Sequence, residues 1–171
     1  MPGSVRFADC SRNCITSLQK ELPRNLTEFY CYKNRIIAEL EYLPDSMEVF
    51  DCEYNRITRV PTVIPPRMKK FNCNYNEITE TPTDMPDTLI FLSITGNKIT
   101  ELISQLPPNL AEFHCNCNPI KHISPANFEI MKMIYINSSF NKTSISIHST
   151  NFYDIQGYSS IAEFFKIKED E

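Results

Sequence analysis

Side chains that could bind a metal ion or exchange protons occur at two places in this chain of 171 residues. The run His114-Cys115-Asn116-Cys117 offers an imidazole and two thiols, and Asp51 and Glu53 offer two carboxylates. A tetrahedral metal site needs four ligands that converge, whereas a strand would point His114 and Cys115 to opposite faces. Paired carboxylates act as acid and base where a cleft perturbs their pKa values. What these residues can do therefore depends on the elements that position them.

A repeat of 21 residues specifies those elements. Its most regular position is an asparagine, which an isoleucine follows two residues later and a proline precedes by eleven residues. The asparagines are Asn13, Asn34, Asn55, Asn76, Asn97 and Asn118, and the prolines are Pro2, Pro23, Pro44, Pro65, Pro86 and Pro107. Positions that keep step over six periods are typical of a solenoid, in which each rung buries its apolar face on its two neighbours.

Each rung contains one short strand. The segment Phe-x-Cys alternates, so both side chains point to one face, and stacked rungs form a parallel sheet with a spacing of about 4.8 Å. We expect four inward-facing columns, of which the fourth is made by the isoleucines. The others are Phe29, Phe50, Phe71, Leu92 and Phe113; Cys10, Cys31, Cys52, Cys73, Ile94 and Cys115; and Leu26, Met47, Met68, Leu89 and Leu110. The cysteines fill core positions, and the lack of a secretion signal favours reduced thiols.

The asparagine and the proline have different roles in the rung. The asparagine amide donates and accepts hydrogen bonds at once, so it can satisfy backbone groups of its own turn and of a neighbouring turn, as a ladder. The proline presets an extended, polyproline-like return and needs no partner for a missing N–H. A period of 21 residues leaves no room for a full helix on the return side.

The string Leu-x-x-Phe-x-Cys-x-x-Asn-x-Ile resembles the hallmark segment of leucine-rich repeats, with Phe, Cys and Ile at leucine positions. The preceding Leu-Pro-x-x-Leu resembles the short subclass found in bacterial type-III effectors and in leucine-rich-repeat proteins of giant DNA viruses of amoebae. The resemblance covers about residues 1 to 140. It implies an α/β-type solenoid that is mostly β, with a parallel sheet on its concave side and an extended convex side. It also implies protein binding, and a host–pathogen interaction if the effector or viral resemblance holds.

The two ends of the array differ from its middle. Effector repeats usually carry an N-terminal helical cap, whereas this chain opens inside a repeat, so we expect the first strand, about Phe7 to Ser11, to be an uncovered edge. After Ile120 the pattern loosens, and Ser139 replaces the asparagine. We expect a helical turn over 125–131, a strand over 144–147 and a helix over 160–167. The predicted organisation is a solenoid over 1–140, a cap over 141–167 and an acidic tail over 168–171.

Outward positions vary from rung to rung while inward positions repeat. One outward column is Asp9, Tyr30, Asp51, Asn72, Ser93, His114 and Tyr135, and the next is Ser11, Tyr32, Glu53, Asn74, Thr95, Asn116 and Asn137. Beside them, on the turn, are Arg12, Lys33, Tyr54, Tyr75, Gly96, Cys117 and Ser138. The candidate partner-binding residues are Tyr30, Tyr32, Asp51, Glu53, Tyr54, Asn72, Asn74, Tyr75 and His114. Tyrosine offers a large area and a polar tip at low entropic cost, although tyrosines also simply fill solvated faces.

Charge and hydropathy limit the partners. The formal net charge is -4, and a nucleic-acid partner would call for a basic stripe. No apolar run reaches the length of a membrane span, and no signal peptide is present, which favours a cytoplasmic protein, or the host cytoplasm for an effector. An open sheet has no cleft, and with three glycines there is no phosphate loop, so we expect no enzyme activity, metal or cofactor. The predicted function is protein binding through the concave face; the alternative is self-assembly through the uncovered first rung, which would give a homo-oligomer.

Overall fold

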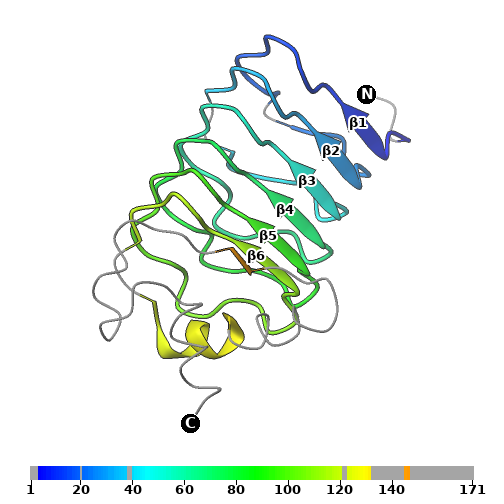
Figure 1. The fold of residues 1–171 in the computed structure, drawn as a ribbon. Coiled ribbons are helices and arrows are strands. Elements are labelled where there is room, and N and C mark those ends of the chain that lie inside the picture. Colours follow the sequence, from blue (N-terminus) through cyan, green and yellow to red (C-terminus); the bar gives the residue numbers. More distant parts are fainter. Residues whose placement is uncertain (1–3, 20, 38–39, 121–122, 132–144, 147–171) are drawn as a thin grey trace.

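The chain forms one stack of rungs, each of which contributes one strand to a single parallel sheet (Figure 1). The computed structural model describes residues 4–19, 21–37, 40–120, 123–131 and 145–146. The strands follow the sequence order across the sheet: β1 (Phe7–Asp9), β2 (Glu28–Tyr30), β3 (Val49–Asp51), β4 (Lys70–Asn72), β5 (Phe91–Ser93), β6 (Glu112–His114) and β7 (Ile145–Ser146). The first six begin 21 residues apart, which confirms the predicted solenoid.

Strands pair in one register throughout the repeat. Phe29 pairs with Phe50 and Phe50 with Phe71, each 21 residues further along the chain. The same position of every rung therefore forms a column across the sheet. From the second rung to the sixth, all four predicted inward columns are buried, with no member more than 5% exposed. In the first rung the corresponding side chains are only partly buried: Val5, Ala8, Cys10 and Ile15.

The predicted asparagine ladder is confirmed. The Asn55 Oδ1 accepts a hydrogen bond from the Ile36 N–H of the preceding rung at 3.0 Å. Its Nδ2 donates to the carbonyl of Cys31 in that rung at 2.9 Å and to the carbonyl of Cys52 in its own rung at 3.0 Å. Asn34, Asn76, Asn97 and Asn118 repeat this arrangement. Each of these amides thus satisfies backbone groups on two rungs.

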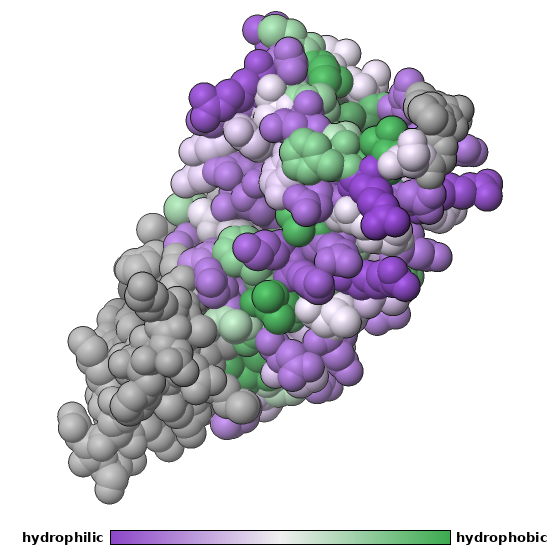
Figure 2. Space-filling view, turned by 90° about the vertical axis from the view of Figure 1, so that its right-hand side faces the viewer, coloured by the Kyte–Doolittle hydropathy of each residue, from purple (hydrophilic) through white to green (hydrophobic). Residues whose placement is uncertain are grey.

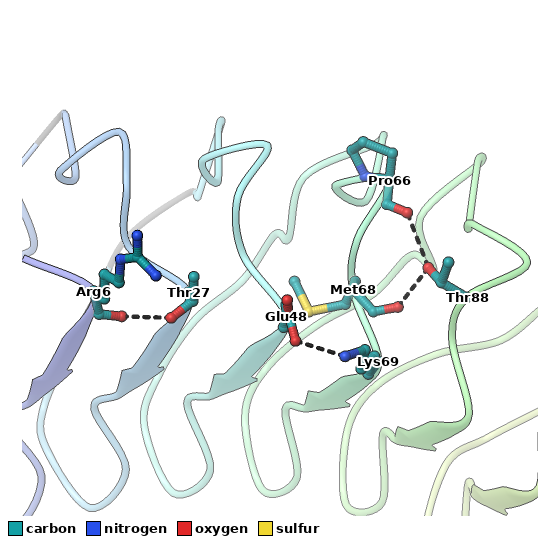
Figure 3. A network of polar contacts seen from close by, with 7 residues as sticks. All are labelled: Arg6, Thr27, Glu48, Pro66, Met68, Lys69 and Thr88. Carbon is teal, nitrogen blue, oxygen red and sulfur yellow. Dashed lines mark hydrogen bonds and ion pairs between the residues drawn. The ribbon is translucent and has the colours of Figure 1, made fainter.

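The proline of each rung starts the turn that leads into the strand. The Pro23 carbonyl accepts a hydrogen bond from the Leu26 N–H at 3.0 Å, and the next four rungs repeat this bond. Side chains in and around the turn join neighbouring rungs, as Figure 3 shows: the Thr88 hydroxyl donates to the carbonyls of Pro66 and Met68. The Lys69 ammonium lies 2.7 Å from a Glu48 carboxylate oxygen in the same view. The return segments are therefore held in step with the sheet.

The C-terminal end of the array departs from the repeat length of 21 residues. The helical turn predicted over 125–131 is confirmed, and its Asn127 is fully buried. The Asn127 Nδ2 donates to the Ile103 carbonyl, and its Oδ1 accepts from the Leu106 N–H, both at 2.6 Å. The strand predicted over 144–147 is also confirmed, because β7 pairs with β6.

The structure corrects the outward columns at this end. Ser146 lies beside His114, in the position that the count of 21 assigns to Tyr135. The physical reason is that the helix over 125–131 lengthens the return, so the partner of His114 lies 32 residues further along the chain instead of 21.

 Asn137, Ser138, Ser139, the helix predicted over 160–167 and the tail over 168–171 lie outside the described residues, and the boundaries 1–140 and 141–167 stay a prediction. Within the described part of the chain, no helix has the length and apolar character needed to cross a membrane.

Candidate functional site

The candidate residues lie on the open face of the sheet and on the turn that follows it. Tyr30, Asp51 and Asn72 pair in register on β2, β3 and β4, so they form one continuous column. His114 belongs to β6, with Ser93 of β5 between it and Asn72. The structure therefore brings together the candidates of the second to fourth rungs and leaves His114 apart from them. Figure 2, which views the strand side of Figure 1, shows a mainly hydrophilic surface with separate hydrophobic patches.

A hydrogen-bonded network joins the polar candidates. The Asn72 Nδ2 donates to Asp51 Oδ2 at 3.1 Å and to Glu53 Oε2 at 3.2 Å. Asp51 Oδ1 also accepts from the Glu53 N–H at 3.0 Å. Burial raises the pKa of Asp51, against the lowering effect of the hydrogen bonds from Glu53 and Asn72, and the charge of Asp9 adds to the rise. The two carboxylates are thus held in place, with Asp51 partly desolvated.

The amide of Asn74 serves the neighbouring rung. Its Oδ1 accepts hydrogen bonds from the Ser93 hydroxyl and from the Thr95 N–H, both at 2.7 Å. The backbone N–H of Asn74 donates to Asn72 Oδ1 at 3.2 Å. Asn72 and Asn74 therefore order the strand ends, and much of their hydrogen-bonding capacity is used within the chain.

Aromatic side chains form a row along the turn. The rings of Tyr54 and Tyr75 are stacked, with centroids 4.5 Å apart and planes at 8°. The Lys33 ammonium lies 5.6 Å from the centroid of Tyr54, at a distance that permits a cation–π interaction. At the other end, a Cβ on Gly96 would lie 2.6 Å from Cδ1 of Tyr75, so the ring rests against the glycine backbone. Two exposed tyrosines are in this way fixed in one orientation.

The residues of this turn have left-handed backbone conformations. Their φ angles are 53° for Lys33, 53° for Tyr54, 51° for Tyr75 and 68° for Gly96. This conformation costs roughly 1–2 kcal/mol for a residue with a Cβ. Hydrogen bonds to the next rung oppose this cost, because the Tyr54 N–H donates to the Asn74 carbonyl at 2.9 Å and the Tyr75 N–H to the Thr95 carbonyl at 2.7 Å. The sequence placed these residues on a turn, but their conformation directs the side chains into the stacked row.

Replacing Gly96 by alanine tests whether the glycine seats the stack. We expect a loss of about 2 kcal/mol in the free energy of unfolding, from the left-handed backbone and from displacement of the Tyr75 ring. In a Tyr75→Ala background, the same substitution should cost about 1 kcal/mol, because only the backbone contribution remains. Urea denaturation of the four proteins measures both costs. An equal cost in the two backgrounds would show that the ring does not depend on Gly96.

Sequence reasoning missed one outward column, at the first residue of each strand. Its members are Phe7, Glu28, Val49, Lys70, Phe91 and Glu112. The rings of Phe7 and Tyr30 lie 5.7 Å apart, and the Tyr30 hydroxyl donates to Glu28 Oε2 at 3.1 Å. Burial, followed by that hydrogen bond, raises the pKa of Tyr30. The signal was present in the strand alternation, because the residue before an inward phenylalanine must point outward.

The residues first considered for metal binding diverge. Cys115 is 1% exposed in the core, whereas the strand directs His114 to the sheet face, 5.8 Å from the ring of Phe91. Burial raises the pKa of Cys115, so its thiol stays protonated. Among the residues that the structure describes, no three or more His, Cys, Asp or Glu side chains are placed to hold a metal ion.

The chain is similar to known proteins of solved structure. No protein-family model matches the sequence, and no curated protein does. YopM from Yersinia enterocolitica is 29% identical over 74% of this chain and 28% of its own, with a TM-score of 0.65. The functional domain of InlJ from Listeria monocytogenes is 29% identical over 68% of this chain and 26% of its own (TM-score 0.64). YopM from Yersinia pestis, a leucine-rich effector protein, is 27% identical over 73% and 34%, with a TM-score of 0.63. The chain therefore spans about a quarter to a third of the length of these proteins.

Proposed function

We propose that this chain, which has the leucine-rich-repeat fold, is a non-enzymatic module that binds a protein partner through the concave face of its sheet. The fold itself is a scaffold for protein interaction, and a host protein in the cytoplasm is the partner that a likeness to effectors favours. One observation carries the proposal. Tyr54 and Tyr75 are 44% and 43% exposed and yet stacked in one orientation. Aromatic side chains that are already ordered bind with a smaller entropic cost.

The contacts divide the candidate residues by role. Tyr30, Tyr32, Tyr54 and Tyr75 supply the contact area, and the carboxylates of Asp51 and Glu53 add charge beside them. The Asn72 amide holds the two carboxylates in place, and the Asn74 amide orders Ser93 and Thr95 of the next rung. His114, on β6, would contact only a partner that extends over most of the sheet.

A pull-down of the partner by the intact chain tests this function. We expect the variant Tyr30→Ala/Tyr32→Ala/Tyr54→Ala to recover at least about tenfold less partner, because aromatic residues at the centre of an interface each contribute about 1–2 kcal/mol or more. The control is Tyr42→Ala, because Tyr42 is 79% exposed and lies outside the strands and the turn row. Circular dichroism establishes that both variants fold. Equal recovery by the triple variant and the wild-type protein would reject the proposed face.

Self-assembly through the first rung is the second candidate. Phe7 is 57% exposed, and Ala8 and Cys10 are partly buried, whereas their counterparts Phe29 and Cys31 are 4% and 0% exposed. A second copy that covers β1 would bury these side chains. Light scattering over a dilution series measures the mass, and a monomer at every concentration would exclude this candidate.

A further inference from the structure

We infer that strands β1 to β3 bind a basic, extended segment of the partner, and this inference rests on the proposed function. The sheet face of these strands combines exposed or partly exposed aromatic and apolar side chains with carboxylates. The apolar contribution comes from Phe7, Tyr30 and Val49, and the carboxylates are Asp9, Glu28, Asp51 and Glu53. Charge complementarity therefore selects arginine and lysine side chains as the occupants.

The four carboxylates lie close together and have no basic partner in the described part of the chain. Asp9 and Asp51 flank Tyr30 in the same column of the sheet. No lysine or arginine nitrogen of the described residues lies within 4.0 Å of any of the four. The two cations on the adjacent turn, Arg12 and Lys33, lie over the rings of Tyr32 and Tyr54 at 5.8 Å and 5.6 Å. The negative charge of this face is thus left for a partner to neutralise.

The titration of two groups agrees with this arrangement. Burial raises the pKa of Asp51, and the charge of Asp9 raises it further. Burial also raises the pKa of Tyr30, with additional contributions from Glu28, Asp51 and Asp9. The charges of these side chains affect one another across three strands, so a cation from the partner would stabilise the ionised forms of all three carboxylates at once.

The apolar side chains between the carboxylates suit the stems of basic residues. The exposed ring of Phe7 lies 5.7 Å from that of Tyr30, and Val49 pairs with Glu28 on the neighbouring strand. Arginine and lysine cover apolar surface with their methylene groups while the charged head reaches a polar group. Parallel strands are spaced about 4.8 Å apart, so Asp9 and Asp51 are about 10 Å apart, which three residues of extended chain would span. Two basic residues separated by two others would fit this spacing.

The other half of the same face has a different character. In β4 to β6, the corresponding positions are Lys70, Asn72, Phe91, Ser93, Glu112 and His114. This part has one lysine and one carboxylate where β1 to β3 have Asp9, Glu28 and Asp51. Its charge does not favour a basic segment, so the position of the segment is confined to the first three strands.

Binding of defined peptides to the intact chain tests the inference. The probe is a fluorescent nonapeptide that contains three arginines among serine and leucine residues, and its control has citrulline in place of each arginine. We expect the arginine peptide to bind at least about fivefold more tightly than the citrulline peptide, and its affinity to fall as salt screens the charges. Equal binding of the two peptides, or binding that salt does not change, would overturn the inference.

Charge-neutralising variants locate the site. Asp51→Asn/Glu53→Gln and Asp9→Asn/Glu28→Gln should each weaken the arginine peptide by about three- to tenfold. The second pair keeps the acceptors for the Ser11 N–H and the Tyr30 hydroxyl, so it tests charge with little effect on the fold. The matched control is Glu48→Gln/Glu77→Gln, because these carboxylates pair with Lys69 and Lys98. Wild-type affinity in both of the first two variants would contradict the inference.

The two proposals fail in different ways. If the triple tyrosine variant loses the partner while both carboxylate pairs keep it, protein binding by this face stands and the basic segment is wrong. If neither kind of variant changes recovery of the partner, the proposed function is wrong as well.

Discussion

Replacing Asn55 by alanine is expected to lower the free energy of unfolding by about 3–5 kcal/mol. The side chain is 9% exposed and satisfies the N–H of Ile36 and the carbonyls of Cys31 and Cys52. Each buried backbone group that loses its partner costs about 1–3 kcal/mol. The loss also falls on two rungs at once, and a solenoid has only contacts between neighbours with which to compensate. Urea denaturation followed by circular dichroism measures the change.

Asn13 provides the matched control for this substitution. It occupies the same position in the first rung, but it is exposed, and its amide donates only to the carbonyls of Cys10 and Ser11. Asn13→Ala should cost no more than about 1 kcal/mol, because water can replace these bonds. If Asn13→Ala and Asn55→Ala cost the same, the bonds to the preceding rung do not stabilise the stack.

Replacing Phe50 by alanine is expected to lower the free energy of unfolding by about 3–5 kcal/mol, because it leaves a cavity in the core. The ring is fully buried, and its centroid lies 5.9 Å from that of Phe29 and 5.7 Å from that of Phe71. Phe50→Leu should cost much less, about 1–1.5 kcal/mol, because Leu92 already occupies the same column without exposure. Urea denaturation of the two variants measures the difference between their free energies of unfolding.

A double-substitution experiment tests whether the column acts through neighbours. Phe50→Ala and Phe71→Ala share one cavity, so their costs should deviate from additivity by at least about 0.5 kcal/mol. Phe50 and Phe113 lie three strands apart, and their substitutions should be additive. Equal deviations from additivity in the two pairs would show that the coupling does not come from contact between neighbouring phenylalanines.

The inward half of the molecule could be predicted because packing repeats it. Every rung has the same neighbours, so the phenylalanine, cysteine and isoleucine positions need the same kind of side chain, and counting in steps of 21 finds them. The amide of Asn55 was predictable for a similar reason, because its partners are backbone groups that every rung provides. The surface has no such constraint, and there the prediction was less complete.

Three features needed the structure. The stack of Tyr54 on Tyr75 depends on a left-handed backbone, which sequence pattern does not reveal in residues other than glycine. The network of Asp51 and Asn72 depends on side-chain orientation across strands. The pairing of β7 with β6 depends on a return that is lengthened by a helix, after which counting in steps of 21 no longer applies.

The asparagine ladder gives the stack a direction. Asn34 reaches back to the Ile15 N–H and the Cys10 carbonyl, and each later ladder asparagine likewise reaches back to the rung before it. The isoleucine N–H of a rung is therefore satisfied only when the following rung has folded onto it. During synthesis on the ribosome, the isoleucine N–H of the newest rung therefore has no asparagine partner until the next rung is made, and the array is completed from its N-terminal side. Loss of a rung from either side unpairs backbone groups of its neighbour, but only loss from the C-terminal side also removes the asparagine amide that satisfies the isoleucine N–H of the rung before it.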